Sequence, residues 1–425
     1  MASDYPEQPL EEVADLSGGF AFKSGDYSPD GRFVLRTLNI DDDGSIHRKD
    51  AAFLPLEKCD QYKRFELQEH DTLFVMVGAT LGKVGYVRRE SLPALLNQNM
   101  WRIRGREGLC DKRYLQYAFR HTVAQRLGWA SGSARDFVRR DDYRTMKIPV
   151  PPLQEQKRIA HILGTLDDKI ELNRRMNATL EAMARTLFQS WFVNFDPVRR
   201  NSEGGAKRPE DSLFPDSLED SAIGEIPIGW EVCSLSKKIE LLSGGTPKTS
   251  EPTYWDGDVP WYSVRDAPTE TDVWVIQTDK SVTEQGIANS AAKICPEKTT
   301  IISARGTVGK LALTGVPMAM NQSCYGIRGI SGYGDFFAYY LVREATVRLQ
   351  QNAHGSVFDT ITTRTFESLD CVFPNKELTI AFDKAVEPLL SKIRANLHQS
   401  HTLATLRDTL LPKLLAGEVQ APTAK

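Results

Sequence analysis

Two stretches of the chain place their seam residues at spacings that alternate between four and three. In the first stretch these residues are Ile159, Leu163, Leu166, Ile170, Asn173, Asn177, Leu180, Ala184, Leu187 and Trp191. In the second they are Phe382, Val386, Leu389, Ile393, Asn396, Ser400, Leu403, Arg407, Leu410 and Leu414. The spacing is that of the a/d seam of a coiled coil. It predicts long helices over residues 151–196 and 374–418.

The two seams are polar at the same two places. Asn173 and Asn177 correspond to Asn396 and Ser400 at an offset of 223 residues. A polar layer weakens a coiled coil but fixes its register and the number of its partners, so we predict that the two helices pair. Two unrelated amphipathic helices, each packed on its own domain, are the alternative. Pro388 and Pro412 interrupt the second pattern; we expect a kink or a later start at the former and a loosened end at the latter.

The segments before the helices also repeat. LSGG at 16–19 returns at 242–245, TLGK at 80–83 as TVGK at 307–310, and NQNMWRIRG from Asn97 as NQSCYGIRG from Asn321. SGSARDFV around Gly132 answers AHGSVFDTI around Gly355. The offsets, 226, 227, 224 and 223, keep the motifs in order. Each motif alone is weak, but four in register indicate a duplicated module.

Alternating apolar positions, as in DTLFVMV and TTIISA, predict strands, and stretches such as DKRYLQYAFRHTVAQRL predict helices. The fold class expected is therefore α/β (mixed α+β) in each module. The expected boundaries are a first module at 1–150, a helix at 151–196, a linker at 197–222, a second module at 223–373, a helix at 374–418 and a tail at 419–425. The linker is rich in Pro, Gly, Ser and charge, without periodicity.

Composition narrows the class of protein. The 425 residues include 53 Lys and Arg against 56 Asp and Glu, which excludes a uniformly basic binder but not a local basic face. The acidic opening carries no secretory signal, and no apolar run reaches the roughly 20 residues of a membrane span. Six scattered cysteines without a C-x-x-C pair are typical of reduced thiols, so we expect a cytoplasmic protein.

Charge gathers in the later half of each module. From Lys83 to Lys147 there are fifteen basic and six acidic side chains, and from Lys298 to Phe366 there are seven and three. Such segments could neutralise phosphates or could be solvated faces with local ion pairs, and charge alone favours neither. Two similar modules on two rods would suit DNA half-sites at a fixed spacing, and a two-fold symmetric protein partner equally well.

The motifs of common chemistry are absent. The turns at Gly78–Lys83 and Arg305–Lys310 lack the glycine spacing and the hydroxyl residue of a phosphate-binding loop. His398 and His401 have no acidic partner at metal spacing, so an exposed helix face is expected there and no metal site. We find no methyltransferase box and no activated nucleophile, and we expect a binding scaffold without catalytic residues. An enzyme with its own nuclease or transferase site remains the alternative.

Several segments together resemble the specificity subunit of type I DNA restriction-modification systems. They are PPLQEQKRIAHILGTLDDKIELN, SWFVNFDPV, GEIPIGWEV and SGGTPKTS, and the resemblance covers nearly the whole chain. The first module departs from it with SGGFAFKS where the second has SGGTPKTS.

The resemblance implies that each module is a target recognition domain for one half of a bipartite site in double-stranded DNA. It implies an antiparallel coiled coil that sets the spacer and a pseudo-two-fold architecture. It also implies two docked modification subunits, which carry S-adenosylmethionine and methylate adenine, and a restriction subunit that cleaves. The chain itself would hold no cofactor and no metal and would contact no membrane. A related combined restriction-methylation system, or a protein-interaction scaffold without DNA recognition, are the alternatives.

Candidate DNA contacts are the polar and basic residues of the glycine turns and of the repeated segments. In the first module they are Lys83, Asn97, Gln98, Arg135 and Arg139; in the second they are Lys248, Arg265, Lys310, Asn321, Gln322 and Arg364. The shared Asn-Gln pairs have a second interpretation, because residues that bond strand ends would also be the same in both modules.

Overall fold

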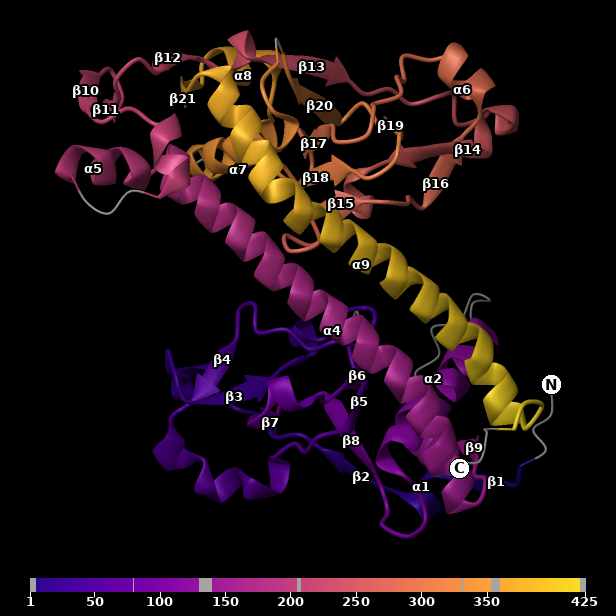
Figure 1. The fold of residues 1–425 in the computed structure, drawn as a ribbon. Coiled ribbons are helices and arrows are strands. Elements are labelled where there is room, and N and C mark those ends of the chain that lie inside the picture. The colour runs from indigo at the N-terminus through magenta and orange to yellow at the C-terminus, as the bar shows by residue number, and fades with distance from the viewer. Residues whose placement is uncertain are drawn as a thin grey trace. The chain divides into compact units, whose positions relative to one another are not determined.

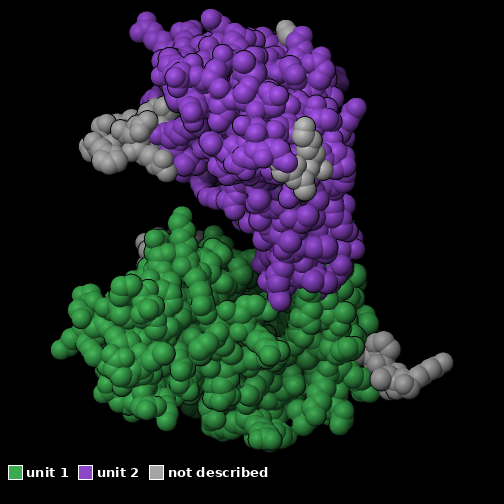
Figure 2. Space-filling model, turned by 60° about the vertical axis from the view of Figure 1, so that its left-hand side comes forward, with its two compact units in different colours: residues 1–168, 403–425 green, residues 169–402 purple. Residues whose placement is uncertain are grey.

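The computed structural model describes residues 5–78, 80–129, 140–204, 208–330, 332–352 and 360–420. The chain divides into two compact units, which Figure 2 colours separately. Unit 1 comprises Met1–Asp168 and Leu403–Lys425, and unit 2 comprises Lys169–Thr402. Two long helices, α4 (Leu153–Phe192) and α9 (Lys376–Ala416), each supply one segment to each unit (Figure 1). No helix among the described residues is long and apolar enough to cross a membrane.

Unit 1 contains two sheets and a short strand pair. The four-stranded sheet has the order β2 (Ala14–Gly18), β8 (Met100–Gly105), β5 (Thr72–Val75), β6 (Val84–Tyr86), and its pairs are antiparallel. The three-stranded sheet has the order β4 (Ala52–Leu54), β3 (Arg32–Leu35), β7 (Ala94–Leu96). β1 (Glu7–Pro9) pairs with β9 (Lys147–Pro149). The helices are α1 (Leu10–Val13), α2 (Lys112–Trp129) and α3 (Arg140–Arg144).

Unit 2 repeats this arrangement. Its five-stranded sheet has the order β13 (Ile239–Ser243), β20 (Cys324–Gly329), β17 (Thr300–Ser303), β18 (Leu311–Thr314), β15 (Trp274–Val275). Its three-stranded sheet has the order β16 (Lys280–Val282), β14 (Trp255–Tyr262), β19 (Ala319–Met320), and β12 (Glu231–Ser234) pairs with β21 (Asp370–Phe373). The helices are α6 (Glu284–Ala288), α7 (Asp335–Asn352) and α8 (Thr363–Glu367). Only β15 extends a sheet beyond its counterpart in the described part of unit 1.

Strand register confirms the duplication. Gly18 pairs with Trp101 and Phe74 pairs with Trp101 in unit 1; Ser243 and Ile302 pair with Tyr325 in unit 2. Gly18 therefore corresponds to Ser243, an offset of 225. The LSGG motifs are 226 residues apart, so they do not align the two strands correctly. The motif begins one position later on β13 than on β2. The repeat around Gly132 and Gly355 lies outside the described residues.

The long helices pair antiparallel within each unit. In unit 2, Trp191 of α4 contacts Phe382 of α9, whereas Asn177, earlier on α4, contacts Asn396, later on α9. In unit 1, Ile159 and Leu163 share a core with Leu411, Leu414 and Leu415. The helix α9 is continuous through Pro388 and Pro412, so the later start expected at Pro388 is wrong. Pro388 is exposed, which leaves the carbonyl that it cannot bond open to water.

The region between the first helix and the second module is more ordered than a linker. It contains α5 (Asp196–Glu203) and the hairpin of β10 (Leu218–Ser221) with β11 (Gly224–Pro227). Arg200 forms an ion pair of 2.6 Å with Asp211, whose side chain is fully buried, and Val198 and Phe214 join the core of unit 2. These contacts could not be predicted from the sequence, because the segment packs through isolated residues without periodicity and is rich in proline, glycine and charge.

Candidate nucleic-acid interface

The loops that carry the repeated motifs meet at one edge of each sheet. In unit 2, β13 and β17 end where β20 and β18 begin, so the loops at 244–250, 304–310 and 321–323 lie together. Residues 263–266 adjoin them because Asn321 donates its backbone N–H to Tyr262, and 360–364 because Ile361 donates to Ala304. We call these five segments the loop edge of unit 2.

Unit 1 has the same edge. The strands β2 and β5 end where β8 and β6 begin, which brings together residues 19–24, 76–78, 80–83 and 97–99. Residues 36–39 join them because Asn97 donates its backbone N–H to Leu35. We call these segments the loop edge of unit 1.

A glycine in each loop edge packs directly on the Asn-Gln segment. A Cβ atom on Gly19 would lie 1.9 Å from the carbonyl oxygen of Asn97, and one on Gly244 would lie 1.9 Å from that of Asn321. Only glycine permits this approach. The shared glycines and asparagines therefore hold the two edges in the same shape.

The candidate side chains of the Asn-Gln segments are engaged to different degrees. Asn97 is buried, and its side-chain amide donates to the Tyr27 hydroxyl at 3.4 Å. The Asn321 side chain accepts the N–H of Ser323 at 3.0 Å, and Gln322 accepts a hydrogen bond from Thr246. Gln98 is exposed. These contacts favour a role of both asparagines within the fold, and DNA contact by the glutamines stays a prediction.

Lys83 and Lys310 occupy equivalent positions with different surroundings. The Lys83 ammonium donates to the carbonyl of Ile40 at 2.9 Å and pairs with Asp42 at 2.8 Å. The Lys310 side chain is exposed and makes no hydrogen bond or ion pair to the described residues. The glycine turn therefore directs one lysine onto its own unit and leaves the other available to a ligand.

The loop edge of unit 2 gathers further bases of the same kind. Lys248, Arg265 and Arg364, all predicted contacts, are exposed, and so is Arg305. None of these side chains has a charged or hydrogen-bonded partner in the described parts of the chain. Arg135 and Arg139, the predicted contacts of the first module, lie outside the described residues.

Much of the basic charge counted in the first module is used within the fold. Arg104 makes two hydrogen bonds of 2.6 and 2.7 Å to Asp71, whose side chain is fully buried. Arg106 pairs with Asp15 and Arg113 pairs with Asp168. The acidic partners come from outside the basic segment, so a count within the segment overstates the charge that is free to meet phosphate.

The polar layer of the long helices is built in unit 2. The Asn173 amide donates to the carbonyl of Asn396 at 3.3 Å and to the Ser400 hydroxyl at 3.1 Å, and Asn396 donates to Asn177 at 2.9 Å. Asn177 in turn donates to Asp272 of the second module at 3.0 Å. Most other seam residues are buried or half-buried, and Leu390, outside the predicted seam, is fully buried. The layer therefore fixes helix register and also bonds the helices to the module.

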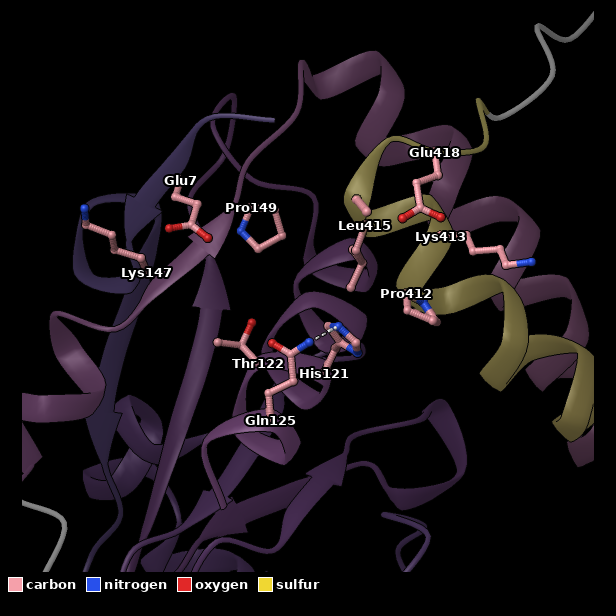
Figure 3. A pocket seen from close by; sticks show the side chains of 11 residues that line it. Glu7, His121, Thr122, Gln125, Lys147, Pro149, Pro412, Lys413, Leu415 and Glu418 are labelled. Carbon is pink, nitrogen blue, oxygen red and sulfur yellow. Dashed lines mark hydrogen bonds between the residues drawn. The ribbon is translucent and has the colours of Figure 1, made fainter. Parts of the chain in front are cut away.

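A cavity of about 260 Å³ in unit 1 lies where strands β1 and β9 meet α2 and the end of α9 (Figure 3). Glu7 and Glu418 balance Lys147 and Lys413 around it, and His121 contacts Gln125 at 2.8 Å. Burial lowers the pKa of His121. No ion pair joins these acidic and basic side chains in the described part of the chain. No group of three or more His, Cys, Asp or Glu able to hold a metal occurs among the described residues, and His398 and His401 are exposed.

Comparison with known proteins identifies the family. The family of the type I restriction modification DNA specificity domain matches residues 3–182 and 227–382, one match for each module; the first includes most of α4 and the second only the start of α9. The chain belongs to this family.

Two relatives and one solved structure resemble this chain over most of its length. The HindI specificity subunit of Haemophilus influenzae is 29% identical over 66% of this chain and 70% of its own length. The MjaIX specificity subunit of Methanocaldococcus jannaschii is 27% identical over 79% of this chain and 76% of its own length. The crystal structure of the S subunit of a type I restriction-modification system from M. genitalium has the same fold, with a TM-score of 0.56, 15% identity and coverage of 100% and 97% of the two chains.

Proposed function

We propose that the chain is the DNA specificity subunit of a type I restriction-modification complex, in which each module recognises one half of a bipartite site in double-stranded DNA. The duplicated loop edge carries this proposal. Equivalent strands present equivalent loops twice in one chain, and on unit 2 those loops bear exposed bases that have no partner among the residues described. Exposed Lys and Arg side chains neutralise phosphates and bond guanine edges.

The paired helices would set the spacer between the half-sites and dock two modification subunits. The polar layer at Asn173, Asn177 and Asn396 supports this, because it gives the pair a single register. The modification subunits would bind S-adenosylmethionine and methylate adenine, and a restriction subunit would cleave. The chain itself would supply recognition and no catalytic residue.

Mapping of methylated adenines tests the proposal. Cells that carry the chain with its modification subunits should methylate a bipartite sequence with a non-specific spacer of constant length. A continuous site would contradict recognition by two modules. Assembly with the modification subunits but without DNA binding would indicate a protein scaffold, and methyl transfer or cleavage by the purified chain alone would contradict the non-catalytic role.

A further inference from the structure

The hairpins of the two loop edges share a frame. The strands β5 and β6 are joined by residues that include Gly78 and Gly82, with φ of 95° and 87°. The strands β17 and β18 are joined by residues that include Gly306 and Gly309, with φ of 76° and 85°. No described atom lies within 4 Å of a Cβ built on Gly78 or Gly306, so space would permit a side chain there, and the left-handed φ is what favours glycine.

One exposed position in this frame changes its chemistry. Val77 directly precedes Gly78, and Arg305 directly precedes Gly306. The other aligned positions keep their class: Thr80 with Thr307, Leu81 with Val308 and Lys83 with Lys310, while the first hairpin is one residue longer. Positions 77 and 305 are thus the variable site on an otherwise shared turn.

If the two modules recognise different half-sites, they need different side chains at equivalent positions of their loop edges. The Asn-Gln pairs are the same in both units, so they cannot account for a difference between half-sites. Val77 is 53% exposed and Leu81 is 40% exposed, which places two apolar side chains on one turn of unit 1. Arg305 is exposed, and its backbone is fixed by a bridge to Thr360.

The major groove offers a distinct partner for each side chain. The C5 methyl group of thymine is its apolar feature, and the O6 and N7 atoms of guanine accept the fork of an arginine. We propose that Val77 and Arg305 are specificity-determining residues, with Val77 against a thymine methyl in one half-site and Arg305 against a guanine in the other. This inference rests on the proposed function and names the base contacts that would serve it.

Base analogues test the Val77 contact in the chain assembled with its modification subunits. Once the methylated site is mapped, each thymine of the half-sites is replaced by uracil, which removes only the methyl group. One replacement should weaken binding about fourfold, the value of one buried methyl group. Val77→Ala should weaken binding to the natural site and abolish the difference between thymine and uracil. Leu56→Ala is the control, because Leu56 is 64% exposed and follows β4 at the opposite end of its sheet.

The Arg305 contact is tested in the same way with 7-deazaguanine, which lacks the N7 acceptor. One replacement, in the half-site that Val77→Ala leaves unchanged, should cost at least about fivefold, and Arg305→Ala should remove that sensitivity. Lys237→Ala, an exposed base before β13 at the opposite end of the sheet, should change neither.

Each contrary result has its own meaning. A salt-dependent loss in Arg305→Ala without sensitivity to the analogue would indicate a phosphate contact and overturn that half of the inference. Insensitivity to uracil at every thymine would overturn the Val77 contact. If the natural complex methylates no bipartite site, the proposed function and this inference fail together; if it does and both variants match their controls, only the inference fails.

Discussion

Tyr117 in unit 1 and Tyr340 in unit 2 lie 223 residues apart at equivalent positions, yet their hydroxyl groups have different neighbours. Tyr117 donates to Asp167 of α4 at 2.6 Å, and Asp167 forms an ion pair of 2.7 Å with Arg407 of α9. The counterparts of Asp167 and Arg407 are Leu390 and Ala184, both fully buried. The Tyr340 hydroxyl is buried without a hydrogen-bond partner among the described residues, and its ring stacks on Phe188 at 5.7 Å.

The comparison shows that the same helix packing can be filled by a polar set of residues in unit 1 or by an apolar set in unit 2. In each unit the residues of the set match one another. Burial, with the Asp167 carboxylate as a second cause, raises the pKa of Tyr117, so its hydroxyl stays protonated and donates. A buried ion pair is often replaceable by apolar residues at little cost, whereas removal of one partner is costly. We therefore expect that exchange of the whole set between the units costs little stability and that exchange of one member costs much more.

The largest expected effect follows from breaking the polar set of unit 1. Asp167→Leu removes the partly buried partner of Arg407, whose side chain is 14% exposed, and leaves it, among the described residues, only the exposed Asp408 at 2.8 Å. We expect a loss of about 3 kcal/mol in the free energy of unfolding. Adding Arg407→Ala gives unit 1 the residue pair of unit 2 and should restore stability to within about 1 kcal/mol. Urea denaturation of the full chain measures both.

The adjacent Asp168 supplies the control. Its side chain is 61% exposed and pairs with Arg113, so Asp168→Ala should cost less than about 1 kcal/mol. Equal losses in the single and double variants at 167 and 407 would show that the two sets are not interchangeable.

The N-termini of α2 and α7 differ in a second way. Asp111 accepts the N–H groups of Arg113 and Tyr114 at 3.0 and 2.9 Å and so caps its own helix. In unit 2 the cap position is Gly334, and Asp383 of α9 accepts the N–H groups of Phe336 and Phe337 at 3.2 and 2.8 Å. A Cβ on Gly334 would lie 2.4 Å from the Asp383 carboxyl, so glycine at 334 and aspartate at 383 require each other.

This partly buried cap predicts a pH dependence of unit 2. Burial raises the pKa of Asp383 from 3.8 to about 7. A raised pKa means that the folded state favours the proton, so this contribution to stability is complete below pH 3.8 and is lost as pH rises to about 7. Relative to Asp383→Asn, the natural chain should lose about 2 kcal/mol between pH 5.5 and 7 and little above pH 8.

Urea denaturation of both proteins across this pH range measures the difference. Parallel stability curves would show that Asp383 does not titrate in this range and would contradict the assigned cause.

Exchange of the caps should have a smaller effect. Asp383→Ala removes the cap of α7 and should cost about 1 kcal/mol. Adding Gly334→Asp gives α7 the arrangement of α2 and should recover most of that loss in thermal denaturation. Gly334→Asp alone, with Asp383 in place, is the control and should be less stable than either. If Gly334→Asp alone were as stable as the natural chain, Asp383 would not require glycine at position 334.

The smallest effects concern the lysines of the loop edges. Lys310→Ala should weaken DNA binding by the assembled complex about 3- to 10-fold and lower its salt dependence by about one phosphate contact. Lys83→Ala should change the salt dependence little, because its ammonium is bonded to Ile40 and Asp42. Titration of binding against salt concentration compares them, and the opposite order would reverse their assigned roles.

The sequence predicted the features that repeat and missed those that differ. The heptad pattern indicated the helices that contain Asn173 and Asn396, and four motifs in order indicated two similar sheets. The ion pairs of Arg104 and Arg106 were not predictable, because their partners Asp71 and Asp15 lie far away in the chain. The difference between Val77 and Arg305 was not predicted from the sequence, because it becomes apparent only when the two turns are aligned on their left-handed glycines.

Lengthening the paired helices tests the central claim most directly. Asn173 meets Ser400 and Asn177 meets Asn396, so positions 175 and 398 are opposite each other. A helical heptad inserted after Arg175 and another after His398 preserve the seam and add about 10 Å, or up to about three base pairs. Methylation mapping should then give the same two half-sites with a longer spacer. Altered half-sites with an unchanged spacer would contradict the claim that the modules recognise the half-sites independently and that the helices set the spacer.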